Sequence, residues 1–473
     1  MSGWPELVSV ALLGTERREP PTLSHAELSA FAGEGSSEER LLAAAGAVAV
    51  YRRAGRAALA APALPAPSPG DERPACGPAA TSRLSVLLGD RRALLPEWLR
   101  ALAATGARAP AEHVPDLLQA ATATPALQAE VEAVLGERGR WLAVQEPRWA
   151  WAAALPDGEE AREQLWATGE RPQRRRLFAL IRGEQPQEAR ALLEQGLAQE
   201  EPEDRAWFVS ALADGLSIED EPLLEAVLAD RRQEARTAAA SLLSCLPGSG
   251  FAQRMRERAL PLVQLEGGRR KHVRCALPED CDEAMARDGI VRRPPQGTGR
   301  RAWWLEQLVG WTPLSVWGEI GLSPERVREL QAKDAIDGPL LDGLARAAWI
   351  QCDPQWGVQF LDVEPRMAAF VGAEAAVAVA LAQLGQGGLA VARQIPAPWP
   401  RALSEAALAL LAALLGRADW QSASVIAERL DPALAPEALR RLSGFEPGSP
   451  QARRADEILA TLSFRRDMHE ELR

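Results

Sequence analysis

Apolar residues recur at helical spacing along most of the chain, most regularly between Glu170 and Leu265. This stretch predicts three consecutive helical hairpins, in each of which an amphipathic first helix is followed by a second apolar helix. Arg175, Arg205 and Arg236 belong to the three first helices and recur at steps of 30 and 31 residues. Because such a period is typical of stacked helix-turn-helix repeats, the pattern predicts a repeat array.

Helical spacing also covers both ends of the chain. Near the N-terminus it runs from Trp4 to Leu12, Ser24 and Glu27 form a capping-box pattern, and a longer helix is expected from about Ser37 to Ala60. We therefore predict an all-α fold. Its expected architecture is a right-handed α-α superhelix, that is, a HEAT-like helical-repeat solenoid with one loop-rich insert.

Changes in composition and periodicity divide the chain into five predicted segments. Prolines crowd the stretch between Pro62 and Pro78, which excludes a helix there. A later stretch lacks helical periodicity, although the alternation from His272 to Leu277 fits a short hairpin. The predicted segments are the N-terminal helices (1–60), a proline-rich linker (61–81), the helical-repeat array (82–265), a basic loop-rich insert (266–302) and a C-terminal helical region (303–473).

Start signals mark several helices of the C-terminal region. Each joins an N-cap residue to a first-turn proline, in Ser323-Pro324, Asp353-Pro354 and Asp431-Pro432. Apolar runs predict helices near residues 340–350, 364–384, 404–415, 419–430 and 453–464. The chain is therefore expected to be helical to its last turn.

The charge balance disfavours a general role in coating nucleic acid or anionic membranes. The 473 residues carry a formal net charge of -11, and the pI is about 5.2. The insert has the opposite sign, because Arg269 to Arg301 contains nine basic and five acidic residues. Only Lys271 and Lys333 among the 54 basic residues are lysines. Because this bias toward arginine runs through the whole chain, abundant arginine is here weak evidence for phosphate binding.

Cysteine usage and hydropathy predict a cytoplasmic protein. The cysteines Cys76, Cys245, Cys275, Cys281 and Cys352 are sparse and odd in number, as expected for reduced thiols. The apolar run 7–13 is short and follows an acidic residue, unlike a secretory signal. The tract 375–392 is interrupted by glycine and glutamine, so we expect no membrane segment.

Common catalytic and metal motifs are missing from the sequence. A Walker loop needs lysine directly after glycine, but Lys271 follows an arginine and Lys333 follows an alanine. No Gly-x-Ser-x-Gly elbow or His-Glu-x-x-His helix occurs. His272, Cys275 and Cys281 lack the second ligand pair of a structural zinc site. We therefore predict a non-enzymatic protein with no catalytic residue, metal or cofactor.

The three repeated arginines admit two interpretations. Stacked one repeat apart, Arg175, Arg205 and Arg236 would form a cationic ladder that binds carboxylate or phosphate groups. Alternatively, nearby acids, among them Glu203, Asp204 and Glu234, would pair with them and satisfy the turns between repeats. We favour the structural interpretation and retain the arginines as tentative binding residues.

A similar choice applies to the tryptophans that precede the three regular hairpins. Interleaved arginines would allow a base-stacking platform. Large core fillers that wedge one hairpin against the next are the more common use of such residues. The tryptophans are Trp141, Trp149, Trp151 and Trp166. We expect them to serve in packing.

The insert is the segment in which we expect an acidic partner to dock. Its residues 267–301 carry a net charge of +4, nine basic minus five acidic residues, in an otherwise acidic chain. Loops on rigid scaffolds often carry function. The tentative binding residues in the insert are Arg269, Arg270, Lys271, Arg292 and Arg293.

The opening of the chain resembles the start of an uncharacterised bacterial family of helical-repeat proteins. The resemblance rests on Trp4-x-x-Leu7-Val8-x-x-Ala11-Leu12-Leu13-Gly14-Thr15-Glu16-Arg17, with echoes in Asp288-Gly289-Ile290, Trp304-Leu305-x-Gln307 and Leu322-Ser323-Pro324. It implies a cytoplasmic protein often encoded beside a MoxR-type ATPase and a von Willebrand A-domain protein. The implied role is that of an adaptor that works with such a partner in a chaperone-like or metal-insertion system.

Two functional hypotheses follow. The first is a non-enzymatic interaction scaffold that holds a protein partner along one face of the helical stack. The second is a nucleic-acid-binding protein, related in architecture to helical-repeat DNA glycosylases, that uses the insert and the arginine ladder. A continuous positive groove would favour the second hypothesis, and an acidic or apolar groove the first.

Overall fold

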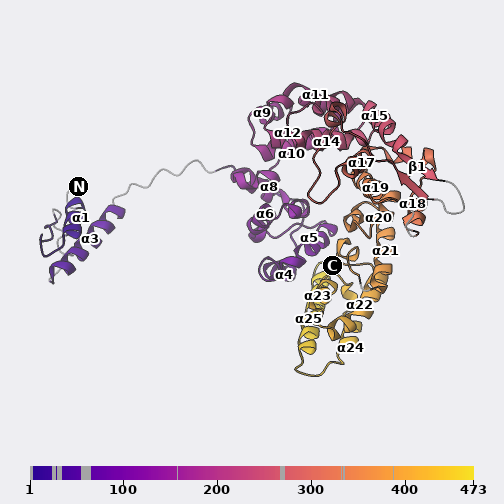
Figure 1. The fold of residues 1–473 in the computed structure, drawn as a ribbon. Coiled ribbons are helices and arrows are strands. Elements are labelled where there is room, and N and C mark those ends of the chain that lie inside the picture. The colour runs from indigo at the N-terminus through magenta and orange to yellow at the C-terminus, as the bar shows by residue number, and fades with distance from the viewer. Residues whose placement is uncertain are drawn as a thin grey trace. The chain divides into compact units, whose positions relative to one another are not determined.

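The computed structural model describes residues 4–23, 28, 35–54, 65–156, 158–266, 272–331, 333, 336–386 and 388–473 (Figure 1). It divides into two compact units, Met1–Pro67 and Ser68–Arg473. The boundary between them falls within the predicted linker. About 70% of the chain is helical, and the described residues contain one small two-stranded sheet. The prediction of an all-α helical-repeat fold is confirmed.

The smaller unit is built on two helices, α1 (Trp4–Leu13) and α3 (Ser37–Ala54). They share a small apolar core that includes Leu7 and Val48. The side chain of Arg40 lies 2.6 Å from that of Glu19 and ties α3 to the segment after α1. The predicted capping box in residues 24–27 and the predicted continuation of the second helix to residue 60 lie outside the described residues.

The larger unit starts with short helices around one apolar core. The elements are α4 (Pro78–Leu88), α5 (Leu95–Ala104), α6 (Val114–Ala123), α7 (Gln128–Val134), α8 (Gly136–Gln145) and the 3-10 helix η4 (Pro147–Ala152). Trp98 on α5 is fully buried in this core. Prolines in the first turns of α4, α5 and α6 fit helix starts, because the first-turn amide needs no helical acceptor.

The predicted repeats follow as stacked helical hairpins. Their helices are α9 (Glu159–Thr168), α10 (Arg171–Glu184), α11 (Pro186–Gly196), α12 (Pro202–Ala211), α13 (Glu221–Val227), α14 (Gln233–Ser244) and α15 (Gly250–Ala259). The first helices α10, α12 and α14 pack side by side. In the seam between α10 and α12, the ring of Phe208 lies 5.1 Å from that of Phe178. Apolar contact between neighbouring repeats thus builds one continuous core.

The insert contains more regular structure than its composition indicates. Strands β1 (Val263–Glu266) and β2 (His272–Cys275) pair antiparallel, with Val263 opposite Cys275, as the expected hairpin requires. A short helix, α16 (Glu283–Arg287), follows. The next helix, α17 (Arg300–Trp311), begins before the predicted end of the insert at residue 302.

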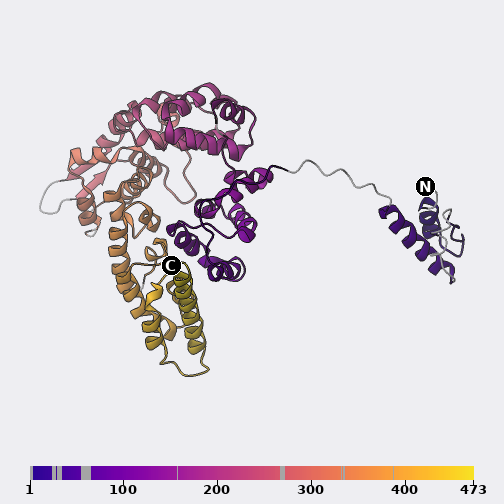
Figure 2. The ribbon, with the colours of Figure 1, turned by 180° about the vertical axis from the view of Figure 1, so that it is seen from behind.

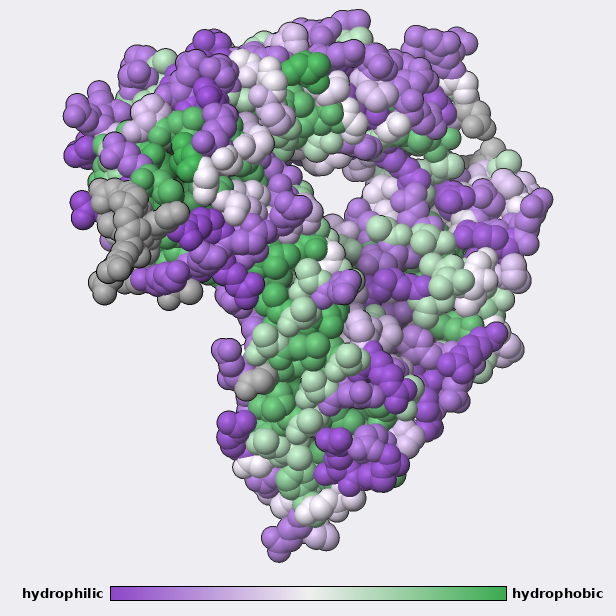
Figure 3. All heavy atoms as spheres, turned by 90° about the vertical axis from the view of Figure 1, so that its right-hand side faces the viewer, coloured by the Kyte–Doolittle hydropathy of each residue, from purple (hydrophilic) through white to green (hydrophobic). Residues whose placement is uncertain are grey.

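The C-terminal region continues the helical stack. Its elements are η8 (Leu314–Ile320), α18 (Pro324–Gln331), α19 (Gly338–Ile350), α20 (Pro354–Phe360), η9 (Pro365–Ala369), α21 (Ala373–Gly385), η10 (Ala392–Gln394), α22 (Arg401–Gly416), α23 (Trp420–Ala427), η11 (Pro432–Leu434), α24 (Ala435–Leu442) and α25 (Pro450–Glu471). Asp353 caps α20 by accepting hydrogen bonds from the amides of Gln355 and Trp356. In Figure 3, hydrophobic residues gather in the lower half of the view, where the alanine-rich helices α21 and α22 lie.

One helix prediction in this region is wrong. The apolar run 364–384 forms two elements, η9 and α21, instead of one helix. Gly372 separates them with a φ of +89°, a conformation that glycine adopts without the steric cost that a Cβ atom brings. The run also starts with Pro365, which has no amide hydrogen to donate.

The two ends of the larger unit meet, which the sequence pattern did not predict. Helix α25 packs against α4 and α5, and the two views in Figures 1 and 2 both show the C-terminus beside the first helices. Met468 of α25 belongs to the core of those first helices. The helices of this unit therefore form a closed circuit of contacts.

A buried ion pair lies at this closure. Glu97 and Arg465 are 3% and 0% exposed, and Arg465 Nε and Nη2 donate to the two carboxylate oxygens over 2.8 and 2.9 Å. Arg465 also donates to the carbonyl oxygens of residues 427 and 430. His469 Nε2 lies 2.7 Å from Glu97 Oε1. One carboxylate of α5 thus binds two side chains of α25.

The seam between α10 and α12 gives a first prediction. Phe208→Ala should lower the free energy of unfolding by about 3–5 kcal/mol, because it removes a buried ring. Trp207→Ala should cost less, since Trp207 is only half-buried, with Arg175 above its ring. Urea denaturation of both variants measures the difference. A Phe208→Ala variant as stable as the wild type would contradict this packing.

The closure gives a second prediction. Glu97→Ala should lower the free energy of unfolding by about 3–5 kcal/mol, because it leaves the guanidinium of Arg465 buried without its carboxylate. Glu437→Ala is the matched control, because Glu437 forms only surface pairs with Arg440 and Arg441. Chemical denaturation should show a large loss for the first variant and little change for the second. Equal effects would show that apolar contact alone holds the ends together.

From the Glu97 carboxylate we also predict how the stability of the fold changes at acidic pH. Burial raises the pKa of Glu97, but hydrogen bonds from His469 and Arg465 outweigh burial and hold the pKa below the ordinary glutamate value. A depressed folded-state pKa adds stability above the unfolded pKa, and this stability is lost as pH falls through the folded pKa. The stability difference between the wild type and Glu97→Ala should therefore shrink below about pH 4. A difference that stays constant as the pH falls further, to about 2, would contradict the pairing.

Candidate functional site

The predicted arginine ladder consists of contacts within the protein. Arg175 Nη2 lies 2.7 Å from Asp204 Oδ1, and Arg205 Nη1 lies 2.6 Å from Asp230 Oδ2. Arg236 Nη1 donates to the backbone carbonyl of Asp230 over 2.8 Å. Arg175 thus binds an acid of the following repeat, whereas Arg205 and Arg236 both contact Asp230 in the turn before α14. Of the acids predicted as partners, Asp204 pairs with Arg175. Asp230, and not the predicted Glu234, contacts Arg205 and Arg236.

Other charged residues of the array are also paired internally. Arg182 and Asp220 are fully buried, and Arg182 Nη2 lies 2.8 Å from Asp220 Oδ2. Arg174 pairs with Glu200, and its guanidinium lies 4.7 Å from the ring centre of Trp166. These pairs bridge successive hairpins and satisfy groups that burial would otherwise penalise. A role of Arg175, Arg205 and Arg236 in binding a partner stays a prediction.

The tryptophans before the array pack against the protein cores. Trp149 and Trp151 contact the core of the first helices, and Trp151 donates to the hydroxyl of Thr122 over 3.0 Å. Trp166 lies 5.4 Å from Phe208 in the next core. These three residues are half-buried, which favours the packing interpretation over a base-stacking platform.

A pocket of about 560 Å³ lies where α14, α17, α19 and η9 come together. Its walls include the aromatic rings of Trp311 and Trp349 and the side chain of Met367. Trp311 is buried, whereas Trp349 is 39% exposed. The charged residues that line it are Glu306, Asp342, Arg346 and Glu364.

Two glycines allow the close helix packing behind this pocket. A Cβ atom on Gly343 of α19 would lie 2.6 Å from Val309 Cβ, and one on Gly310 of α17 would lie 2.7 Å from Arg346 Cδ. At Gly343 the neighbouring Val309 side chain and Glu306 backbone leave no room for a side chain, whereas at Gly310 the flexible Arg346 side chain would have to move. The close approach of α17 and α19 brings Glu306 next to Arg346.

The charges in the pocket are incompletely compensated. Arg346 Nη1 is 4.0 Å from Glu306 Oε1, at the outer limit of an ion pair. Burial raises the pKa of Glu306, which the nearby Arg346 only partly offsets, and the charge of Asp342 raises it further. Burial lowers the pKa of Arg346, whose guanidinium lies 5.0 Å from the ring centre of Trp311 and 5.8 Å from that of Trp303.

Asp342 is the least compensated of these groups. It precedes Arg346 by one helical turn, the spacing at which ion pairs commonly form on a helix. Within the described part of the chain, however, Asp342 forms neither a hydrogen bond nor an ion pair, because Arg346 lies over the tryptophans instead. Partial burial raises the pKa of Asp342. Asp342 is itself exposed, so this shift supports a functional site only together with its unpaired position beside the aromatic pocket.

Glu364 offers a contrast within the same pocket. Arg366 Nε and Nη2 donate to its two carboxylate oxygens over 2.8 and 2.9 Å. This bidentate contact holds the pKa of Glu364 below its ordinary value. The pocket therefore combines one well-paired carboxylate with two that lack a close cation.

A family model described as a family of unknown function (DUF5691) matches residues 6–472. The chain belongs to the DUF5691 family. No curated protein and no solved structure matches it. The family assignment agrees with the resemblance seen in the sequence and leaves function to be argued from the site.

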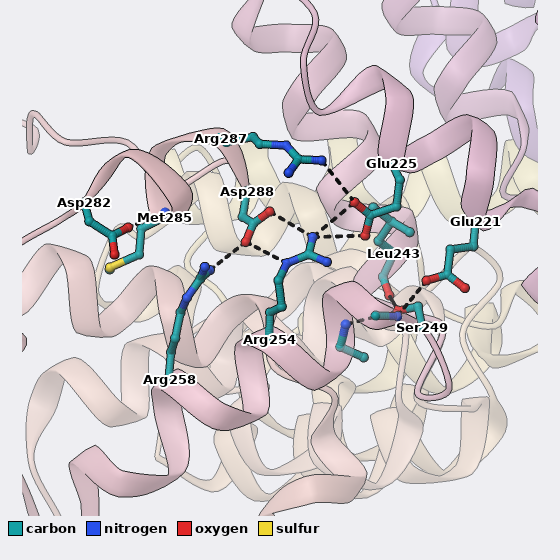
Figure 4. Close-up of polar contacts among 12 residues, drawn as sticks. Glu221, Glu225, Leu243, Ser249, Arg254, Arg258, Asp282, Met285, Arg287 and Asp288 are labelled. Atoms are coloured by element: carbon teal, nitrogen blue, oxygen red, sulfur yellow. Dashed lines mark hydrogen bonds and ion pairs between the residues drawn. The ribbon is translucent and has the colours of Figure 1, made fainter.

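In this DUF5691 protein, the Asp288-Gly289-Ile290 motif anchors the insert to the array. Asp288 is buried and accepts hydrogen bonds from Arg254 over 2.8 and 2.9 Å and from Arg258 over 2.6 Å (Figure 4). Gly289 has a φ of +90°, and Ile290 is buried. Arg254 also pairs with Glu225 of α13, so a single network joins the insert to two hairpins.

The Trp304-Leu305-x-Gln307 motif holds the segment that follows. Gln307 is fully buried, accepts from the amide of Val291 over 2.8 Å and donates to its carbonyl over 3.1 Å. Trp304 Nε1 donates to the carbonyl of Arg292 over 3.0 Å. These family motifs thus have structural roles around the insert and on the helix that carries Glu306.

The predicted binding residues of the insert have different outcomes. Arg292 is exposed and lies 3.0 Å from Glu283. Arg293 is exposed. Arg269, Arg270 and Lys271 lie outside the described residues. An interaction of this segment with an acidic partner stays a prediction.

Sequence reasoning missed the pocket. The tryptophans of α17 were not considered as part of a site. A signal was nevertheless present, because Asp342 and Arg346 occupy one face of a predicted helix that also carries Trp349. In the described residues, no group of three or more potential metal ligands occurs, and no helix is long and apolar enough to cross a membrane.

The uncompensated carboxylates predict a stabilising substitution. Glu306→Gln and Asp342→Asn should each raise the thermal midpoint at pH 7.5, because they remove a charge that the folded state disfavours. Glu364→Gln is the matched control and should not stabilise, since it removes a well-paired carboxylate. Differential scanning calorimetry measures all three variants. A lower midpoint for both pocket variants would contradict the assigned electrostatics.

The sign of the pH dependence follows from the raised pKa values. An acid with a raised folded-state pKa destabilises the fold above that pKa, and the penalty disappears as pH falls below the unfolded pKa. The advantage of Glu306→Gln over the wild type should therefore be largest near neutral pH and vanish below about pH 4. An advantage that grows on acidification would have the wrong sign.

Proposed function

We propose that this protein is a non-enzymatic interaction scaffold that holds a protein partner over the pocket between α17 and α19. One contrast carries the proposal. Arg175 and Arg205 pair with acids of the same chain and Arg236 binds a backbone carbonyl, whereas Glu306 and Asp342 remain under-compensated in an aromatic pocket. Such groups reduce stability, a cost that proteins commonly bear at functional sites.

The surroundings of the pocket support a protein partner. Trp349 at its edge is 39% exposed, and Val363 is 67% exposed. Tryptophan dominates many interfaces because its ring buries a large area in a defined geometry. Polar and charged side chains around this apolar centre resemble the rim of a typical interface.

The resemblance described from the sequence supplies candidates for the partner. We propose a MoxR-type ATPase or a von Willebrand A-domain protein, with this protein as the adaptor between components of one system. The closed circuit of helices in the larger unit suits an adaptor, because it holds the pocket on a rigid support.

The proposal predicts that Trp349→Ala weakens partner binding at least about tenfold, the usual effect of truncating a central interface tryptophan. The partner is isolated by affinity capture from the native host and then purified, together with the two candidate classes. Isothermal titration calorimetry with each purified protein measures direct binding. Leu439→Ala is the control, because Leu439 is exposed on α24 outside the pocket.

A weakening confined to Trp349→Ala supports the proposed interface. Equal affinity for the wild type and Trp349→Ala would remove the pocket from the interface. The absence of any direct protein partner would overturn the scaffold proposal itself.

The nucleic-acid alternative has its own test. We expect no submicromolar affinity for single-stranded or duplex DNA at about 150 mM salt, and no change when Arg269, Arg270, Lys271, Arg292 and Arg293 are replaced by serine. Fluorescence anisotropy measures both proteins. Submicromolar binding that is lost in the serine variant would replace the scaffold proposal by nucleic-acid binding.

A further inference from the structure

We infer that the pocket between α17 and α19 receives the guanidinium group of an arginine side chain from the protein partner. The inference rests on the proposed function and specifies the chemistry that the partner must supply. It follows from three independent properties of the pocket, namely its charge, its aromatic walls and its unused polar groups.

The charge of the pocket calls for one additional cation. Glu364 is neutralised by Arg366, which leaves Glu306 and Asp342 to share the single guanidinium of Arg346. With both carboxylates ionised, these three groups carry a net charge of -1. A monovalent cation next to Asp342 would neutralise the set and offset the effect of burial, which raises the pKa values of both carboxylates. A phosphate group would instead add to the negative charge.

The aromatic walls favour guanidinium among the possible cations. The protein already places a guanidinium near each of two pocket tryptophans, Arg346 at 5.0 Å from the ring centre of Trp311 and Arg366 at 5.0 Å from that of Trp349. A planar guanidinium stacks on an aromatic ring and pairs with a carboxylate through two parallel hydrogen bonds. The compact ammonium group of lysine is more strongly hydrated and does neither as well.

Unused polar groups point to a peptide rather than a free small cation. Trp311 is buried and lines the pocket, and its indole N–H has no acceptor among the described residues. The Thr237 hydroxyl also lines the pocket and forms no hydrogen bond within the described part of the chain. A peptide carbonyl beside the arginine would supply an acceptor for the Thr237 hydroxyl, whereas the Trp311 N–H is buried out of reach of a ligand. A volume of about 560 Å³ lies within the usual range for ligand pockets.

The inference is tested on the full-length protein with small probes. N-acetyl-arginine methylamide is the cationic probe, its citrulline analogue is the neutral isostere, and its lysine analogue compares the two cations. Binding is followed by fluorine NMR of protein labelled with 5-fluorotryptophan, in which the Trp349→Phe variant assigns one resonance. From usual ligand efficiencies, we expect the arginine probe to bind with a Kd on the order of 1 mM.

The expected pattern is specific. The arginine probe shifts the Trp349 resonance, the lysine probe binds more weakly, and the citrulline probe does not bind. Asp342→Asn weakens binding of the arginine probe about two- to fivefold, as expected when an exposed carboxylate loses its ion pair. Glu306→Gln, at a half-buried carboxylate, weakens it at least about tenfold. Glu437→Gln, on the surface of α24, leaves binding unchanged. Since the pocket variants are expected to be more stable than the wild type, loss of binding cannot be attributed to unfolding.

Two results separate this inference from the proposed function. If Trp349→Ala weakens binding of the purified partner but the arginine probe binds no better than citrulline, the arginine inference is overturned and the scaffold remains. If the arginine probe binds with the expected variant pattern but no protein partner exists, the pocket chemistry remains and the scaffold proposal fails. Equal binding of the arginine probe to the wild type and Asp342→Asn also overturns the inference.

Discussion

The ion pair between Glu97 and Arg465 joins two helices that lie 368 residues apart in the chain. Stacked repeats normally leave an apolar face uncovered at each end, and capping elements are required to shield it. In the larger unit, α25 covers the first helices, so the two ends shield one another. Everything between them, including the pocket, is held within a circuit of helices that has no free end.

Arginine has two different uses in this protein. Between repeats, pairs such as Arg175 with Asp204 and Arg205 with Asp230 fix the position of one hairpin on the next. At the pocket, Arg346 lies over tryptophan rings and leaves Asp342 without a partner among the described residues, although the two are one turn apart. The first use satisfies the charges of the fold, and the second leaves a carboxylate available for another molecule. The pairing of each arginine, and not the net charge of the chain, therefore distinguishes the structural arginines from the proposed binding surface.

The sequence predicted the local elements better than their long-range contacts. The period that relates Arg175, Arg205 and Arg236 was sufficient to predict stacked hairpins, because each repeat contacts mainly its neighbours. The break at Gly372 was missed, since an apolar run hides a single residue with positive φ. Nothing local predicts that Glu97 meets Arg465. Asp342 and Arg346 stand at the spacing of a helical ion pair, and no local pattern predicts that Arg346 lies over Trp311 instead.

The most direct test of the central claim is hydrogen–deuterium exchange of the full-length protein with and without its purified partner. The account predicts slower exchange in peptides from α17, α19 and η9, which surround the pocket, and unchanged exchange in α10 and α12. Protection confined to residues 267–299, or to the arginine-bearing helices of the array, would contradict the account and move the binding surface away from the pocket.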